Sequence, residues 1–157
     1  MDKKEIRDRI AGGWLNVHLV FEVLGKPADY VENALEMLLE KLSKEKNLEF
    51  LGKKIHKAKP VEKTEKVFTA FAEVEILINK LPRIIEIIFD YMPSSIEIVE
   101  PTNLAFKNED MNALINDLAA RLHQYDAILK KLKIERTVLI KRLSEELKKK
   151  EGKEKSE

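Results

Sequence analysis

Cysteine is absent from this chain of 157 residues, and its absence removes several kinds of chemistry. Thiolate catalysis, zinc sites with cysteine ligands, iron–sulfur clusters and disulfide bonds all require the thiol group. A chain without cysteine is also typical of a reducing compartment. At this length a protein can bury a core large enough to fold without cross-links, so we expect packing alone to hold the structure.

Long apolar runs and an excess of one charge are missing too. No hydrophobic stretch is long enough to span a bilayer, and Met1–Glu5 lacks the apolar segment of a signal peptide. The 29 basic and 28 acidic residues nearly cancel, so no overall field attracts nucleic acid or a membrane surface. We therefore predict a cytoplasmic protein whose main partner is neither a nucleic acid nor a membrane. The abundance of Lys, Glu and Ile, with a single Gln, is similar to thermophile composition.

Catalytic and cofactor signatures are a third absence. The three histidines lie in separate predicted elements without metal-binding spacing such as HxH or HExxH. The glycines form neither a P-loop nor a dinucleotide-binding motif. Ser94 and Ser95 follow Pro93 without a G-x-S-x-G elbow, and the end of a helix explains them. We therefore predict a non-enzymatic protein without catalytic residues, cofactor or metal.

What the sequence does have is an ordered series of hydrophobic periods. Alternation with a period of two indicates a strand, and apolar residues three or four apart indicate a helix. Gly12–Gly13 and Pro93 mark the ends of elements. The series predicts strands at 15–23, 48–58, 67–78 and 95–99, helices at 2–11, 27–45 and 81–92, and a charged loop at 59–66.

The order β-α-β-β-α-β over residues 14–103 resembles the ferredoxin-like fold. The resemblance implies an α+β sandwich with a four-stranded antiparallel sheet, in which 15–23 and 67–78 are central and both helices cover one face. The Lys-rich strand 48–58 suits a sheet edge, where lysines discourage pairing with another chain. The predicted organisation is an N-terminal helix in 1–13, the ferredoxin-like domain in 14–103, a long coiled-coil-like helix in 108–149 and a disordered tail in 150–157.

The sheet face away from the helices is the first candidate site. Residues of both central strands are predicted to be displayed there, namely Asn16, His18, Val20, Glu22, Thr69, Phe71, Glu73 and Glu75. From this set we select as candidate functional residues His18, Glu22, Phe71, Glu73 and Glu75. Two interpretations stay open, because the histidine and the three glutamates could assemble a metal site, or His18 could simply pair with Glu73 or Glu75.

Two further resemblances bear on function. The turn Leu24–Ala28 is similar to the corner at which ACT domains bind amino acids, although it lacks the acidic residue and following glycine of their Asp-x-Pro-Gly motif. This resemblance implies a small-molecule-sensing regulatory module. RNA-recognition domains share the strand order and stack bases on aromatic residues of the central strands, where this chain has Phe68 and Phe71 on opposite faces. With the lysines of 53–57 and 130–133, weak nucleic-acid binding is a further alternative.

The long C-terminal helix carries the strongest functional signal. It is predicted to begin at Asn108, and no Gly or Pro follows until Gly152. Apolar residues recur every 3.5 residues, which is the period of a coiled coil. These apolar residues would form one continuous line along the helix, which we call the seam. Arg136 interrupts the seam, and a polar residue in such a position commonly fixes the register or the pairing of the helices. The predicted oligomerisation residues are Ile115, Leu118, Leu122, Tyr125, Leu129, Leu132, Arg136, Leu139 and Leu143.

These patterns predict a scaffold protein that self-associates through this helix, as a homodimer, and offers a surface to another protein. The alternative is that the helix packs on its own sheet or on residues 2–11. The apolar pattern extends further than a strand of ordinary length can cover, which favours self-association. A second line of residues on the same helix, Ala113, Ala120, Ala127 and Ile134, offers a second contact.

Overall fold

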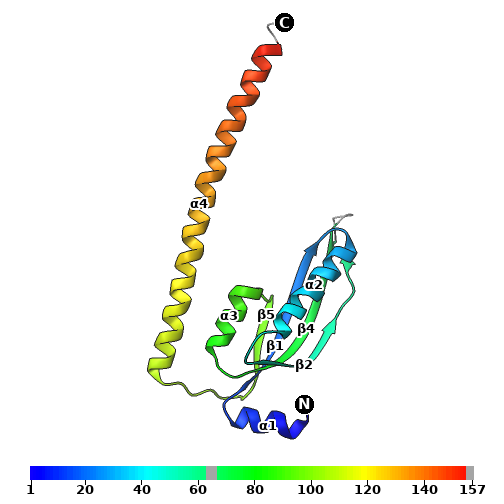
Figure 1. Cartoon of the computed structure of the whole chain (residues 1–157), viewed down its shortest axis with the longest axis vertical. Coiled ribbons are helices and arrows are strands. Elements are labelled where there is room, and N and C mark those ends of the chain that lie inside the picture. The colour runs from blue at the N-terminus through cyan, green and yellow to red at the C-terminus, as the bar shows by residue number, and fades with distance from the viewer. Residues whose placement is uncertain (63–66, 155–157) are drawn as a thin grey trace. The chain divides into compact units, whose positions relative to one another are not determined.

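The computed structural model describes residues 1–62 and 67–154, and the chain divides into two units. The first unit, which we call the body, is Met1–Ala105, and the second is Phe106–Glu157. The protein is α+β, with an antiparallel sheet in the body and one long helix in the second unit (Figure 1). No helix within the described ranges is long and apolar enough to cross a membrane.

The elements follow the predicted series. In chain order they are α1 (Lys3–Ala11), β1 (Leu15–Gly25), α2 (Ala28–Ser43), β2 (Leu48–Ile55), β3 (Lys59–Pro60), β4 (Phe68–Ile78), α3 (Pro82–Tyr91), β5 (Ser95–Glu100) and α4 (Asn108–Glu154). The strands lie in the order β2-β4-β1-β5, and β3 also pairs with β4. All of these pairings are antiparallel, and the two long strands β1 and β4 are central.

The sheet has five strands, so the prediction of four was wrong. Beyond Ile55 the chain continues along β4, because the His56 backbone N–H donates to the Phe71 carbonyl at 2.9 Å. Lys59 and Pro60, which the sequence assigned to a loop, then pair with Thr69 and Phe68. Proline is tolerated because this is the sheet edge, where no neighbouring strand needs its missing N–H. Residues 63–66 of the predicted loop lie outside the described residues.

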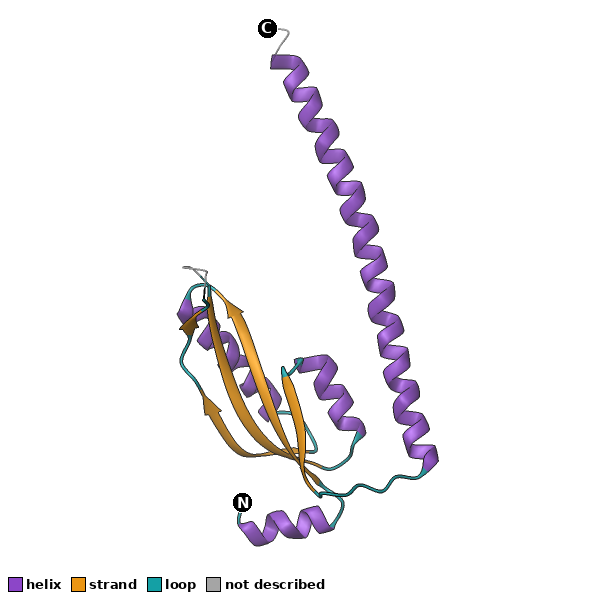
Figure 2. Cartoon of the chain, turned by 180° about the vertical axis from the view of Figure 1, so that it is seen from behind, coloured by secondary structure: helices purple, strands orange, loops and turns teal. Residues whose placement is uncertain are grey.

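The core lies between the sheet and α2 with α3, both of which lie on one side of it (Figure 2). Alternate residues of β1 and β4, such as Val17, Phe21 and Ile76, are buried on that face, as the period of two requires. The helices contribute apolar residues at helical spacing, which are Val31, Leu35, Leu39, Leu42, Ile84, Ile87 and Tyr91. The body therefore has its own hydrophobic core, formed by one face of the sheet and one face of each of these helices.

The N-terminal helix α1 is capped and tied to the body. The Asp2 carboxylate accepts a hydrogen bond from the Glu5 backbone N–H at 2.8 Å, which satisfies an otherwise free donor of the first turn. The helix ends at Ala11 and is followed by its C-cap residue, Gly12, while Gly13 has a φ of +93°, a conformation that other residues rarely adopt. Arg9 lies 4.7 Å from the Trp14 ring and forms an ion pair with Glu49 of β2. These two contacts hold α1 against one end of the sheet.

The second unit is built on α4, which has 47 residues and is therefore about 70 Å long. Glu109 and Asp110 lie in its first turn, where negative charge complements the helix dipole. Ion pairs one turn apart support it, including Lys130 with Asp126 at 2.5 Å. The helix continues to Glu154, so residues 150–154, which the sequence assigned to a disordered tail, are helical, and 155–157 lie outside the described residues.

Candidate functional site

The five candidate residues of the sheet face do lie together. In the register of β1 and β4, His18 is opposite Glu75, Val20 is opposite Glu73, and Glu22 is opposite Phe71. Since alternate residues of a strand share a face, these side chains share the face opposite to the helices. The Thr69 hydroxyl donates a hydrogen bond to the Glu22 carboxylate at 2.8 Å, which adds a further polar contact to the row.

Glu73 is the centre of this face, because two histidines approach its carboxylate. His56 Nε2 is 2.8 Å from Glu73 Oε1, and His18 Nε2 is 4.0 Å from Glu73 Oε2. The His56 ring also stacks on Phe71, with 4.1 Å between ring centroids. His56 was missed by the sequence analysis because it follows an irregular edge strand. A register shift between Phe50 and Gly52 gives that strand an extra residue, which decides the face on which His56 lies.

The face does not form a metal site in the described part of the chain. No group of three His, Cys, Asp or Glu side chains there has the geometry to hold a metal ion. Glu75 accepts a hydrogen bond from Asn16 and Glu22 accepts one from Thr69, so these two carboxylates are directed away from Glu73. The side chains of His18 and Glu73 are 36% and 40% exposed, so water screens their ion pair. The arrangement is that of a solvated polar surface.

One end of this face is closed, contrary to the sequence prediction. Asn16 was predicted to be displayed, but only 5% of it is exposed, and Leu77 beside it is fully buried. The Asn16 amide donates a hydrogen bond to Glu75 at 2.9 Å, while its Oδ1 has no hydrogen-bond partner in the described residues. The Arg9–Glu49 ion pair brings α1 to this end of the sheet, because Glu49 lies opposite Leu77.

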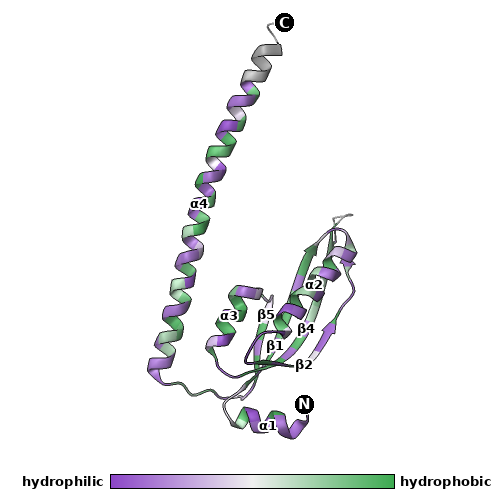
Figure 3. Cartoon of the chain, in the orientation of Figure 1, coloured by the Kyte–Doolittle hydropathy of each residue, from purple (hydrophilic) through white to green (hydrophobic). Residues whose placement is uncertain are grey.

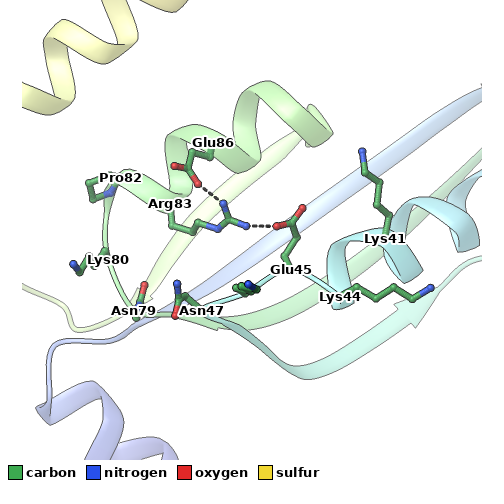
Figure 4. A pocket seen from close by; sticks show the side chains of 10 residues that line it. Lys41, Lys44, Glu45, Asn47, Asn79, Lys80, Pro82, Arg83 and Glu86 are labelled. Atoms are coloured by element: carbon green, nitrogen blue, oxygen red, sulfur yellow. Dashed lines mark hydrogen bonds and ion pairs between the residues drawn. The ribbon is translucent and has the colours of Figure 1, made fainter.

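A second site is a cavity of about 720 Å³ between the end of α2 and the start of α3 (Figure 4). All of its lining residues except one proline are of polar or charged type, namely Lys41, Lys44, Glu45, Lys46, Asn47, Asn79, Lys80, Pro82, Arg83 and Glu86. The Arg83 guanidinium forms ion pairs with both Glu45 and Glu86. The Tyr91 hydroxyl donates a hydrogen bond to the other oxygen of Glu45 at 2.5 Å.

These contacts change the acidity of the groups that make them. The hydrogen bond from Tyr91 holds the pKa of Glu45 below its ordinary value. Burial, together with the Glu45 carboxylate, raises the pKa of Tyr91 to about 12. Glu45 thus joins the end of α2 to both ends of α3. Because the Arg83 guanidinium is already paired with the carboxylates of Glu45 and Glu86, we interpret this cavity as a structural contact between α2 and α3.

The third surface is the line of predicted oligomerisation residues on α4, which we call the stripe. Seven of the nine predicted oligomerisation residues are large apolar side chains that are between 40% and 63% exposed, namely Ile115, Leu122, Tyr125, Leu129, Leu132, Leu139 and Leu143. Leu118 is half-buried and Arg136 is exposed. Figure 3 shows hydrophobic residues recurring along α4 between hydrophilic ones. Ile128 and Ile140, which the prediction left out, flank the stripe and widen it.

A comparison with known protein families finds a match that covers residues of both units. The sequence pattern of the MJ0538 family matches residues 16–154. The chain belongs to the MJ0538 family. No curated protein and no solved structure matches this MJ0538-family chain. The match begins in β1 and ends in the last turn of α4, so the long helix is part of the family pattern together with the sheet.

The sheet face, the cavity and the stripe on α4 of this MJ0538-family protein differ in whether their side chains have partners within the chain. On the sheet face the carboxylates of Glu22, Glu73 and Glu75 each have a partner. In the cavity, Arg83 is held by two carboxylates. On α4, large apolar side chains are exposed over most of the helix, and exposed apolar surface of this kind is typical of an interaction site. The stripe is therefore the strongest candidate for the functional surface.

Proposed function

We propose that this protein is a non-enzymatic scaffold that forms a homodimer through α4 and presents two copies of the body to another protein. The observation that supports the proposal is the stripe of exposed apolar residues along α4. We also propose that the body is a ferredoxin-like sandwich, in which β3 extends the edge strand. The strand order and the position of both helices on one face support that assignment.

The length of the stripe argues against cover by the protein's own sheet. The longest strands, β1 and β4, have 11 residues each, which corresponds to about 36 Å. The seam runs from Met111 to Leu143, which is about 48 Å of α4. A strand of β1 or β4 is shorter than this seam and can cover about three quarters of it. A partner helix as long as the seam can cover all of it.

The period of the stripe indicates that this partner is a helix. A repeat of 3.5 residues keeps its face toward a second helix that carries the same repeat, whereas it drifts away from a flat surface. The other described helices of the chain, α1, α2 and α3, have 9, 16 and 10 residues. The apolar faces of α2 and α3 that carry Leu35 and Ile87 are already buried in the body. A second copy of α4 is the helix that has both the length and the period.

Full-length variants test the self-association. We expect sedimentation equilibrium to give twice the 18.2 kDa chain mass for the unchanged protein, and 18.2 kDa when Leu129→Asp and Leu132→Asp are combined. The matched control is Ile134→Asp, because Ile134 is also an exposed apolar residue of α4 but lies outside the seam. The control should remain a dimer. A monomeric unchanged protein at micromolar concentration, or dissociation in the control alone, would overturn the proposal.

Two other functions stay predictions. The turn Leu24–Ala28 would carry a small-molecule-sensing function, and the sheet face would carry weak nucleic-acid binding. On that face the Phe71 ring is already stacked on His56, and Glu73 and Glu75 repel phosphate. Neither alternative gains a structural observation comparable to the stripe.

A further inference from the structure

We propose that the two α4 helices of the dimer run antiparallel, related by a two-fold axis that passes between residues 130 and 131. This inference rests on the proposed self-association and adds the direction and register of the helices. In this arrangement the residues that meet at each level of the seam are Leu118 with Leu143, Leu122 with Leu139, Tyr125 with Arg136, and Leu129 with Leu132 of the second copy.

The charges of α4 are unevenly distributed along its length. Residues 108–130 contain four acidic and two basic side chains, whereas residues 131–154 contain five acidic and nine basic ones. A parallel, in-register pair would place the two basic halves side by side. An antiparallel pair places each acidic half beside a basic half, so that Glu109 and Asp110 of one copy lie near Lys148 of the other. Attraction between the halves therefore favours the antiparallel direction.

Arg136 gives a second, independent argument. In a parallel pair this residue faces its own copy, and two guanidinium groups would meet in the apolar seam. In the antiparallel pair Arg136 faces Tyr125 of the second copy. An arginine over an aromatic ring is attracted by the ring electrons, and its aliphatic stem packs against apolar neighbours. The polar position that interrupts the seam then has a suitable partner, twice per dimer.

The register follows from the same residues. A shift of one heptad in either direction would place Arg136 against Leu118 or Leu132 and leave Tyr125 against leucine. It would also leave one heptad unpaired at each end. The axis between residues 130 and 131 is close to the centre of α4, which runs from 108 to 154. This register therefore pairs the helix over nearly its whole length.

The residues that flank the seam are consistent with this register. Asp126 lies beside Lys133 of the second copy, on both sides of the axis, and these charges attract each other. One like-charged pair is formed, between Arg121 and Arg142. Its repulsion is reduced because the Asp117 carboxylate is 3.1 Å from Arg121 Nε on the same helix. The balance of flanking charges is therefore favourable near the axis.

Single cysteines test the direction, because the chain has none of its own. Leu118→Cys and Leu143→Cys are made separately in the full chain, mixed after exchange of subunits, and oxidised. In the proposed dimer these two positions meet, whereas two copies of position 118 are about 37 Å apart, far beyond the roughly 7 Å limit for a disulfide. We expect at least about tenfold more covalent dimer in the mixture than in either variant alone.

A matched control uses Ala120→Cys with Lys141→Cys. These positions lie at the same level as each other in the proposed dimer but on its outer faces, so they should not cross-link. Covalent dimer from Leu118→Cys alone would overturn the antiparallel direction while leaving self-association intact. A monomeric mass of the unchanged protein would instead refute the proposed function, so the two failures are distinguishable.

The salt dependence of the dimer is a second measurement of direction. Attraction between unlike halves is screened by salt, so the dissociation constant of the full-length dimer should rise severalfold between about 0.05 and about 0.5 M NaCl. In a parallel pair salt would screen repulsion between the basic halves, and the dissociation constant would fall. A fall would therefore overturn the antiparallel arrangement.

Discussion

Leu35 in α2 and Leu129 in α4 both lie in helices with apolar residues three or four positions apart, yet the first is 0% exposed and the second 54%. The difference lies in what surrounds each helix. Around α2 the chain supplies a sheet and a second helix, and both pack into one core. Among the described residues, no other helix is as long as α4, since α2, the longest of the others, has 16 residues. The same sequence pattern is therefore buried within the body but exposed on α4, where we propose that a second copy of the helix covers it.

The matched change of each leucine to alanine gives the largest expected effects. In the body, Leu35→Ala leaves a cavity in a packed core and should lower the free energy of unfolding by about 2–5 kcal/mol. Urea unfolding followed by the fluorescence of Trp14 measures it. The loss should be the same at low and high protein concentration, because the contacts are made within one chain.

In α4, Leu129→Ala should have little effect on that unfolding transition and should weaken the dimer. Each dimer loses two leucines from the seam, and at about 2 kcal/mol for each leucine the dissociation constant should rise about 1,000-fold. Sedimentation equilibrium over a range of concentrations measures it. If Leu129→Ala destabilised the body as much as Leu35→Ala at every concentration, the contrast between the two regions would be wrong.

At alkaline pH we expect an intermediate loss in the free energy of unfolding of the body. The pKa of Tyr91 is raised from 10.0 to about 12 in the folded protein. Its contribution to stability is fully present below pH 10 and is lost as the pH rises toward 12, by about 2–3 kcal/mol. Unfolding of Tyr91→Phe should lack this loss. An equal loss in both proteins between pH 9 and 12 would show that Tyr91 does not cause it.

The smallest effect is expected on the sheet face. Glu73→Gln removes the carboxylate charge that lies between His18 and His56, but the groups are partly exposed and water can replace these contacts. We expect the free energy of unfolding to change by no more than about 1 kcal/mol. Thermal unfolding at pH 7 is the measurement. A loss as large as that of Leu35→Ala would mean that this face holds the body together.

Local periods in the sequence predicted most of the elements, because each period depends on residues close together in the chain. The alternation in 15–23 and 67–78 predicted the two central strands, and their register brings His18, Glu73 and Glu75 onto one face. The short strand Lys59–Pro60 was missed because two residues have no period and proline argues against a strand. Pairing with β4, which is distant in sequence, forms it.

The features that the sequence could not predict depend on contacts between distant segments. Glu45 meets Arg83 and Tyr91 across separations of 38 and 46 residues, so no local motif indicates the cavity between α2 and α3. Asn16 has the alternation of an exposed residue, yet it is buried at the end of the sheet to which Arg9 ties α1. His56 lies on the sheet face because of an irregular register in β2. The spacing of residues along the sequence predicts none of these three features.

Because α4 is one unbroken helix, its length would set the distance between the two bodies' attachment points in the proposed dimer. In the proposed dimer the two points at which the bodies are attached lie at opposite ends of the paired helices, about 70 Å apart. Each insertion of seven residues would keep the seam in phase and lengthen this span by about 10 Å. An insertion of one or two residues would break the phase instead. The helix would thus act as a ruler that fixes how far apart two bound partners are held.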